Sequence, residues 1–434
     1  MEYTRKEILP GVWLNHLKSD KFKTACITVN LLCQLQRDTA SLNALIPYVL
    51  RRGSVHYDTM EKLSARLDEL YGAAIEPLVR RIGEIQTVGF FASAVEDAFL
   101  PGGQGVLEEV CSLLGELLLS PATRGGLLLP DYVDSEREKL CERIRSVIND
   151  KGSYSVRRCM EEMCCCEDYS AGRFGSEDTA EAIRYQKLSR HYKSLLQSAP
   201  VELFYCGRVG ADSVAKMMKK AFATLPRGEI DYEIGTDVRL NALEDEVRSV
   251  TEVMDVTQGK LVLGFRLGEC MEEPDYAAIY VFNSVFGSGT TSKLFANVRE
   301  RLQLCYYASS LVDVQKGLLL VASGIEFASF EAARDEILAQ LEAIRRGEIS
   351  DEELHAAKSA VVSDMEASMD SPGELEGFYL ANALSGLEIS PPELAELAGN
   401  VTVEQVQAIA RSVECDLIYF LKGEEEEEES HAED

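Results

Sequence analysis

The sequence predicts an α+β protein of two homologous domains, each an antiparallel-rich sheet covered by helices. Short apolar strands, such as 25–35 and 260–267, are separated by long helical patterns. The order of strand, helix, glycine-containing turn and second helix occurs twice, around Gly53 and around Gly287. A length of 434 residues also suits two domains of about 200 residues better than one core. These observations favour a duplicated domain.

Breaks in periodicity predict the domain boundaries. The first domain is expected at 1–228 and the second at 247–423, with a linker at 229–246 where no strand or helix period holds. Residues 424–434 form an acidic like-charge block, which predicts a disordered tail.

The positions of four helices can be predicted in the two copies. The first helix of each copy is expected at 41–50 and at 275–285. The Ser350 and Glu353 side chains are placed to form a capping box at the start of a later helix, and we expect the same of Asp178 and Glu181.

Composition excludes several classes of function. The net charge is −29, and binding to nucleic acid or to an anionic membrane needs a surplus of Lys and Arg. The chain starts without an apolar segment behind a basic one, and it has no run of about 18 apolar residues. We therefore expect a soluble, cytoplasmic protein that binds neither nucleic acid nor membrane.

The twelve cysteines are irregularly spaced, and several lie in apolar segments, which predicts free thiols rather than a disulfide framework. Their only cluster is Cys164–Cys166. Neighbouring residues of a helix point in different directions, so three in a row make a poor set of metal ligands. Buried small side chains are the favoured interpretation, while a metal site or a thiol enzyme at this cluster stays open.

Three longer stretches carry a resemblance to a known family. They are "NALIPYVLRRGSVHYDTMEKLSARLDELYG", "NSVFGSGTTSKLFANVRERLQLCY" and "EAIRRGEISDEELHAAKSAV". Together they resemble the insulinase/pitrilysin (M16) superfamily of zinc metallopeptidases, and in particular its short-chain members that work as two-chain assemblies. The resemblance extends from about Thr24 to Gly423 and implies an insulinase-like fold for both domains.

The resemblance also implies that the zinc site is degenerate. Catalytic members carry His-x-x-Glu-His on the first helix, where two histidines bind zinc and the glutamate activates water. Here the motif falls on 44–48, with Ala44, Pro47 and Tyr48 in place of the histidines and the glutamate. The third ligand of the family, a Glu on a later helix, is expected near Arg143, next to Glu142. We therefore expect this chain to bind no metal and not to be catalytic alone.

In two-chain members, the second domain of one subunit supplies an Arg and a Tyr to the zinc site of the other. The resemblance places them at Arg299 and Tyr306, with Tyr307 as an alternative to the latter. Gln303 stands where the family has a Gly, at a position that reads as a helix C′ residue. Gly adopts positive φ there at little cost, whereas Gln would cost about 1 kcal/mol, so a turn different from that of the family, with a less secure place for Tyr306, stays open. Without the resemblance, Arg299 would be a solvated charge at a helix end and Tyr306 an ordinary strand residue.

The glycine-rich turn at Gly287 and Gly289 lines the substrate chamber in the family. The sequence "GSGTTS" has the glycines of a phosphate-binding loop, but it lacks Gly-Lys-Ser/Thr and lies between two helices. Nucleotide binding is therefore disfavoured.

These inferences predict a non-catalytic, zinc-free subunit of a heteromeric peptidase. Its partner would be a catalytic insulinase-like chain with His-x-x-Glu-His that holds the zinc, and its ligand a peptide substrate. Similar bacterial pairs are linked to peptide processing or to modification of elongation factor P. A purely structural, scaffolding protein is the alternative, and self-dimerisation in the absence of the partner also stays open.

Overall fold

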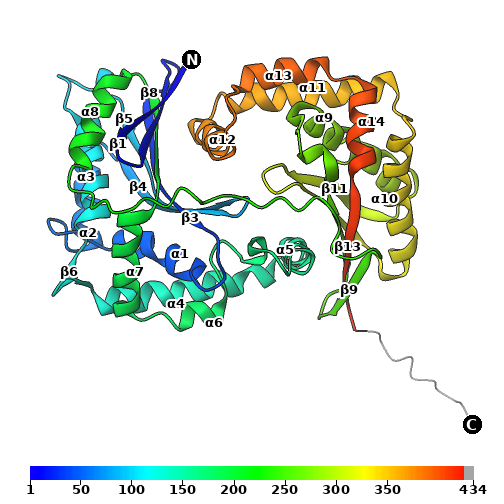
Figure 1. Ribbon diagram of the computed structural model, residues 1–434, viewed down its shortest axis with the longest axis horizontal. Helices are drawn as coiled ribbons and strands as arrows, with labels where there is room; N and C mark the ends of the chain where they lie inside the picture. Colours follow the sequence, from blue (N-terminus) through cyan, green and yellow to red (C-terminus); the bar gives the residue numbers. More distant parts are fainter. Residues whose placement is uncertain (425–434) are drawn as a thin grey trace, which may run out of the picture. The chain divides into compact units, whose positions relative to one another are not determined.

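The computed structural model describes residues 1–424, in which the chain forms two compact units, each with its own sheet (Figure 1). The first unit comprises Met1–Ser146, Ala171–Asp237 and Ser368–Ile389. The second comprises Val147–Ser170, Val238–Ala367 and the described residues from Ser390 onward. The predicted acidic tail, apart from Glu424, lies outside the described residues.

The first unit is built on a six-stranded sheet in the order β1-β2-β8-β3-β5-β4. Its β2 and β8 are parallel, and the other neighbours are antiparallel. The strands are β1 (Glu2–Leu9), β2 (Val12–Lys18), β3 (Thr24–Gln34), β4 (Ala74–Ile82), β5 (Ile85–Val95) and β8 (Val201–Gly207), with a separate two-stranded ladder of β6 (Thr123–Arg124) and β7 (Leu127–Leu128).

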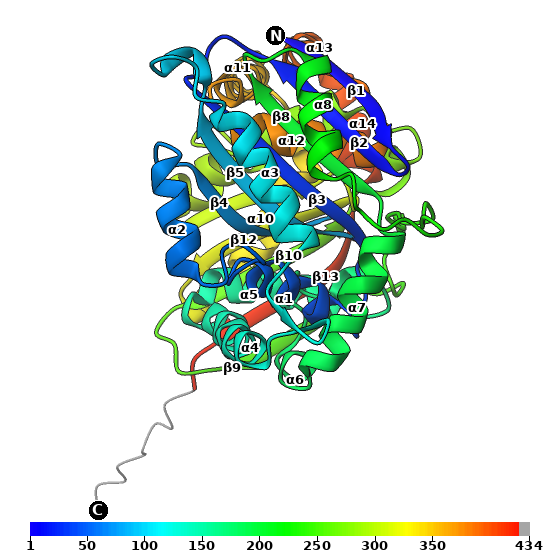
Figure 2. The same cartoon turned by 90° about the vertical axis from the view of Figure 1, so that its left-hand side faces the viewer.

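The main core of the first unit lies between one face of this sheet and several helices, of which α3 and α8 can be followed across the strands in Figure 2. Helix α1 is the most deeply placed, because every one of its residues except Tyr48 is buried. The helices are α1 (Ala40–Leu50), α2 (Met60–Glu69), α3 (Val106–Leu119), α4 (Pro130–Ser146), α6 (Glu177–Glu181), α7 (Tyr185–Ser198), α8 (Ala211–Ala221), α12 (Pro372–Ser385) and the 3₁₀ turn η1 (Asp97–Phe99).

The opposite face of the first sheet is covered by α12, which comes from the C-terminal half of the chain. Leu375 and Tyr379 pack there with Leu17, Phe204 and other residues that alternate with the main core along the strands. The buried carboxylate of Glu376 accepts hydrogen bonds from Thr28 Oγ1 at 2.8 Å and from Arg80 Nη2 at 2.7 Å. One ion pair thus fixes α12 over a partly polar face.

The second unit is built on a five-stranded sheet in the order β11-β12-β10-β13-β9. The pair β13 and β9 is parallel, and the other pairs are antiparallel. The strands are β9 (Arg248–Val253), β10 (Gly259–Arg266), β11 (Cys305–Asp313), β12 (Leu318–Ile325) and β13 (Glu414–Lys422). The helices are α5 (Lys151–Met163), α9 (Tyr276–Phe286), the π-helix η5 (Leu294–Arg301), α10 (Phe330–Arg345), α11 (Asp351–Ser368), α13 (Pro391–Asn400), α14 (Val403–Ser412) and the 3₁₀ turns η2 (Val147–Asn149), η3 (Asp168–Ser170), η4 (Gly268–Met271) and η6 (Phe327–Ser329).

The two sheets share one topology, which confirms the predicted fold class. The order β2-β8-β3-β5-β4 corresponds to β9-β13-β10-β12-β11, and in both sheets the only parallel pair is at the same place. Helices α1 and α9 begin and end within one residue of the predicted 41–50 and 275–285. Each unit also contains a helix from the other half of the chain, α12 in the first unit and α5 in the second. The contiguous domain boundaries at 228 and 247 stay a prediction.

Two predicted caps have different outcomes. The capping box of Ser350 and Glu353 is confirmed, since Ser350 N donates to Glu353 Oε2 at 2.8 Å and Glu353 N donates to Ser350 Oγ at 3.2 Å. The box at Asp178 and Glu181 was wrong, because α6 begins two residues earlier, at a box formed by Ser176 and Thr179. Serine and aspartate side chains both accept from an amide, so Ser176 and Asp178 were both possible caps and the local pattern did not fix the starting residue.

Helix α5 is held on the second sheet by buried charges. The guanidinium of Arg266 is fully buried and donates to Glu167 Oε1 at 2.6 Å, to Asp416 Oδ2 at 2.9 Å and to Met163 O at 3.1 Å. Lys316 Nζ, also buried, contacts Glu167 Oε2 at 2.7 Å. Because Met163 is the last residue of α5, a cation lies at the negative end of the helix dipole.

Among residues 1–424, the structure contains no helix that combines the length and the apolar character needed to span a membrane.

Replacing Glu376 by Ala should lower the free energy that protects α12 from local opening by about 3 kcal/mol, because Arg80 would keep a half-buried charge without its partner. Amide hydrogen exchange across 372–385 measures the change. Glu374→Ala is the matched control, since Glu374 is an exposed carboxylate of the same helix and should cost less than about 1 kcal/mol. Equal effects of the two substitutions would contradict the anchoring role of Glu376.

The second unit should lose stability in acid through Glu167. Burial alone raises the pKa of the Glu167 carboxyl, but Arg266 and Lys316 outweigh burial, so the pKa lies below its ordinary value. The stabilisation is therefore complete at neutral pH and is lost as the pH falls below about 4.3 toward the lowered pKa. Hydrogen exchange of α5 at pH 7 and pH 4 should show a steeper acid loss in the parent than in Glu167→Gln, and parallel losses would refute this assignment.

Candidate functional site

The degenerate motif lies in the interior of α1. Ala44 is fully buried in the main core, and Pro47 is buried within the helix. The helix continues past the proline, because Arg51 N donates to Pro47 O at 3.0 Å. These positions therefore contribute to packing and offer no side-chain atom that could bind a metal.

The structure brings the remaining two expected ligand positions together. The guanidinium carbon of Arg143, on α4, lies 4.0 Å from the centre of the Tyr48 ring, which is cation–π geometry. A fixed positive charge thus stands where the family has an anionic ligand, so these residues do not fit a zinc ion. Among the described residues, no group of three or more His, Cys, Asp or Glu side chains is arranged to hold a metal.

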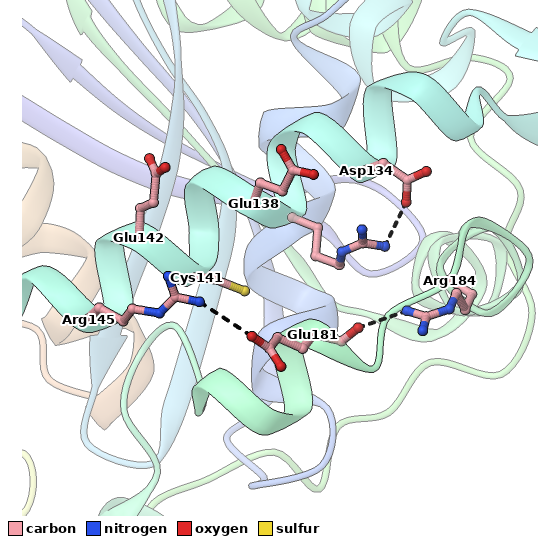
Figure 3. Close-up of a pocket in the computed structure, with 8 residues that line it drawn as sticks. Asp134, Glu138, Cys141, Glu142, Arg145, Glu181 and Arg184 are labelled. Carbon is pink, nitrogen blue, oxygen red and sulfur yellow. Dashed lines mark hydrogen bonds and ion pairs between the residues drawn. The ribbon is translucent and has the colours of Figure 1, made fainter.

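Glu142, the nearest carboxylate in sequence, lines a pocket of about 690 Å³ instead (Figure 3). Two of its arginines are paired with carboxylates, Arg137 with Asp134 at 2.6 Å and Arg145 with Glu181 at 3.3 Å. The third, Arg184, donates to the carbonyl oxygen of Glu181 at 2.8 Å. Burial raises the pKa of the Cys141 thiol, which also lines it. The pocket therefore holds a satisfied surface network and no prepared nucleophile.

In the second unit, the segment with Arg299 is a π-helix. Leu302 N donates to Asn297 O at 3.1 Å, and Leu304 N donates to Val298 O at 3.0 Å, so the chain turns back immediately after η5. Gln303, within this turn, has φ of +52°. The residue is therefore left-handed although it is not a glycine, and the turn is formed despite a side chain that costs about 1 kcal/mol there.

The Arg299 side chain is 43% exposed, and its guanidinium carbon lies 4.7 Å from the centre of the Phe295 ring. Its Nε is 3.6 Å from the carboxylate of Glu300, which is also exposed. Such an exposed pair contributes little to stability. The guanidinium is thus supported by an aromatic ring and available to a ligand.

A β-bulge exposes Tyr306. In the ladder between β11 and β12, Cys305 is opposite Ile325 and Tyr307 is opposite Gly324, so Tyr306 is the extra residue. Its side chain is 59% exposed. The bulge was not predicted, and no sequence signal for it is evident at this position.

Tyr307 is turned toward the protein instead. A Cβ on Gly324 would lie 2.6 Å from Tyr307 Cε1, so the ring occupies the space that the glycine leaves free. Burial raises the pKa of Tyr307. Of the two tyrosines, Tyr306 is therefore the one that a ligand can reach.

The glycine-rich turn has a steric reason for its glycines. A Cβ on Gly287 would lie 2.6 Å from Ser310 Oγ, which is fixed by its hydrogen bond to Asn283 Oδ1 at 2.6 Å. Gly289 has φ of +109°, a conformation that other residues rarely adopt. The turn thus brings η5 close to β11.

The helix η5 is held in place by two side-chain contacts, neither of which was predicted from the sequence. Lys293 Nζ, on a nearly buried side chain, contacts Glu353 Oε1 at 2.8 Å, and Asn297 Nδ2 donates to Gln340 Oε1 at 2.9 Å. Glu353 thus serves both a helix cap and η5. The capping pattern had disclosed only the first of these contacts.

Comparison with known proteins identifies the family. A sequence profile described as "Peptidase M16 inactive domain" matches residues 182–361. The "Probable inactive metalloprotease YmfF" of Bacillus subtilis is 33% identical over 417 residues, which is 96% of each chain. The "Uncharacterized zinc protease YmxG" of the same organism is 26% identical and spans 55% of this chain and 57% of its own length.

Solved structures with the same fold lead to the same family. A conserved protein from Enterococcus faecalis superposes with a TM-score of 0.87 at 27% identity and covers 97% of this chain and 99% of its own. A protease from Helicobacter pylori, at 17% identity, shares the fold with a TM-score of 0.77 and covers the same shares of the two chains. These similarities confirm the resemblance found in the sequence: the chain belongs to the peptidase M16 family, as one of its inactive members.

Proposed function

We propose that this chain is the non-catalytic, zinc-free subunit of a heteromeric cytoplasmic M16 peptidase. In this proposal it binds peptide substrate and supplies Arg299 and Tyr306 to the zinc site of a catalytic partner that carries His-x-x-Glu-His. The chain's own α1 site takes no part in chemistry.

The observation that carries the proposal is the exposure of Tyr306 on a β-bulge. The bulge interrupts the β11–β12 ladder, and it turns outward an aromatic side chain that an uninterrupted strand would place differently. The exposed Arg299 lies on the same turn, which is closed by the hydrogen bond from Leu304 N to Val298 O. Neither side chain contributes to a core, so both groups are available to a ligand.

The chemistry of the two groups suits a peptide. A guanidinium binds a carbonyl or carboxylate oxygen with two parallel donors. A phenol donates a hydrogen bond to the oxyanion of a tetrahedral intermediate, and fixed donors of this kind act in the transition state. The bulge holds one of these groups, and the π-helix holds the other through the contacts of Lys293 with Glu353 and of Asn297 with Gln340.

The isolated chain should contain no stoichiometric zinc and should not cleave peptides, because Ala44 and the Tyr48–Arg143 stack leave no ligand set. Elemental analysis after mild chelation, together with a quenched-peptide assay, measures both properties. One zinc per chain would refute the zinc-free part of the proposal.

In a reconstituted pair, Arg299→Ala and Tyr306→Phe should leave folding and pairing intact and lower turnover by the partner. Loss of one preorganised donor typically costs about 10²-fold to 10³-fold in kcat. Arg299→Ala should also raise KM, since a carbonyl anchor acts in the ground state, whereas Tyr306→Phe should act mainly on kcat. Steady-state kinetics with a quenched peptide separate the two effects.

Matched controls lie beside both residues. Arg301→Ala removes an exposed guanidinium of the same helix that is paired with Glu336, and Tyr307→Phe removes the hydroxyl that faces inward. Both should keep parental kinetics. If Arg299 and Tyr306 variants pair normally with unchanged kinetics, the scaffolding alternative replaces the proposal, and an effect confined to Tyr307→Phe would transfer the role to that residue.

A further inference from the structure

Two of the twelve cysteines differ from the rest. Cys165 and Cys166 are adjacent and exposed in the turn that follows α5, whereas the other ten are buried or half-buried. All twelve are free thiols, and the Sγ atoms of Cys165 and Cys166 are 3.8 Å apart. A reagent in solution therefore reaches a pair of thiols here.

The surroundings separate this pair from the neighbouring thiols. Cys159 and Cys164 are fully buried, and burial raises their pKa values, so both stay protonated and shielded. Burial and the contact with Cys166 also raise the pKa of Cys165, but the guanidinium of Arg248 beside it opposes this effect. The guanidinium of Arg248 is thus the one cation described beside the pair, and it lies on the Cys165 side, where it favours the charged form of that thiol.

We propose that Cys165 and Cys166 form a reversible dithiol–disulfide pair that is oxidised by a hydroperoxide. The Cys165 thiolate attacks one peroxide oxygen, which breaks the O–O bond and gives a sulfenic acid and an alcohol or water. The Cys166 sulfur then attacks the sulfenic sulfur, forms the S–S bond and releases the second oxygen as water. Two thiols lose two electrons and two protons, and the peroxide takes up both.

The geometry of adjacent residues makes this disulfide reversible. Consecutive Cα atoms are about 3.8 Å apart across a trans peptide, which is below the usual range of about 4.4–6.8 Å for disulfides. The ring that closes is therefore strained, and strained or exposed disulfides are the easily reduced ones. The pair fits a redox-sensitive site better than a permanent cross-link.

The pair lies next to the buried ion pairs of Glu167 with Arg266 and Lys316, which hold α5 on the second sheet and are called the α5 clamp below. Cys166 directly precedes Glu167, whose carboxylate contacts the buried Arg266 and Lys316. Arg248, beside Cys165, donates to the carbonyl oxygens of Glu162 at 3.0 Å and Met163 at 3.1 Å at the end of α5. Closing the strained ring pulls on this turn, so oxidation should loosen α5.

The full chain tests the proposal after reduction and removal of the reductant. It is treated with equimolar hydrogen peroxide, labelled in the native state with N-ethylmaleimide and digested with trypsin, which releases residues 159–173 as one peptide. The reduced sample should carry two labels on this peptide, and the oxidised sample should carry none and have lost two hydrogens. Glutathione should restore both labels, and α5 should exchange its amide hydrogens faster in the oxidised form.

Three single substitutions test which two cysteines form the disulfide. Cys165→Ser and Cys166→Ser should each abolish the intramolecular disulfide, and Cys164→Ser should keep it. A bond lost in Cys164→Ser, a disulfide between two molecules, or sulfinic acid as the main product would each overturn the pair. Unchanged exchange in α5 would overturn its coupling to the α5 clamp. Phenylarsine oxide, which bridges two thiols, gives an independent check: one equivalent should protect both sulfurs from labelling, and failure to protect would count against the pair.

Discussion

The fold depends on the neutralisation of cations that lie on the sheets beneath covering helices. In the first unit Arg80 of β4 meets Glu376 of α12, and in the second Arg266 of β10 meets Glu167, just after α5. Leaving a buried or half-buried charge without its partner costs several kcal/mol, so each carboxylate holds its covering segment on the sheet. Because each covering helix comes from the other half of the chain, this constraint also selects which helix covers which sheet.

A cation with a partner on a neighbouring helix is also found at the α1 site. A zinc ion needs lone pairs from at least three side chains, and the family takes them from two helices. Here α1 and α4 still meet, but they meet through Tyr48 and the guanidinium of Arg143. At the positions where the resemblance places zinc ligands, the cation is therefore a guanidinium of the chain itself, and the Tyr48 ring supplies its partner. The helix pair keeps its packing without a metal.

Much of this could be predicted from the sequence, because periodicity and repeated order are local signals. The two copies, the first helix of each and the Ser350 cap all follow from residue type and spacing. The covering helices α5 and α12 are different, since an amphipathic pattern shows that a helix has an apolar face and not which sheet it covers.

In the candidate site, too, particular residues show what could not be predicted from the sequence. The spacing of Arg299 and Tyr306 was visible, but the bulge that separates Tyr306 from Tyr307 was not. A bulge changes which of two adjacent residues faces solvent, and both are tyrosines, so composition carried no information about the outcome. Lys293 and Gln340 were missed for a related reason. The partner of Lys293 is Glu353 on α11 and that of Gln340 is Asn297 on η5, and residues so far apart in sequence meet only in the folded chain.

Strained and irregular backbone gathers in one place in the second unit. The π-helix η5, the left-handed Gln303 and the bulge at Tyr306 follow one another within a few residues, and each is less stable than regular structure would be. The α1 site shows the opposite tendency, since its residues pack in regular helix with buried apolar side chains. Backbone of this kind is less stable than regular structure and is found chiefly at binding and catalytic sites. Its position beside the exposed Arg299 and Tyr306 therefore supports the proposed ligand-binding role over a purely structural one.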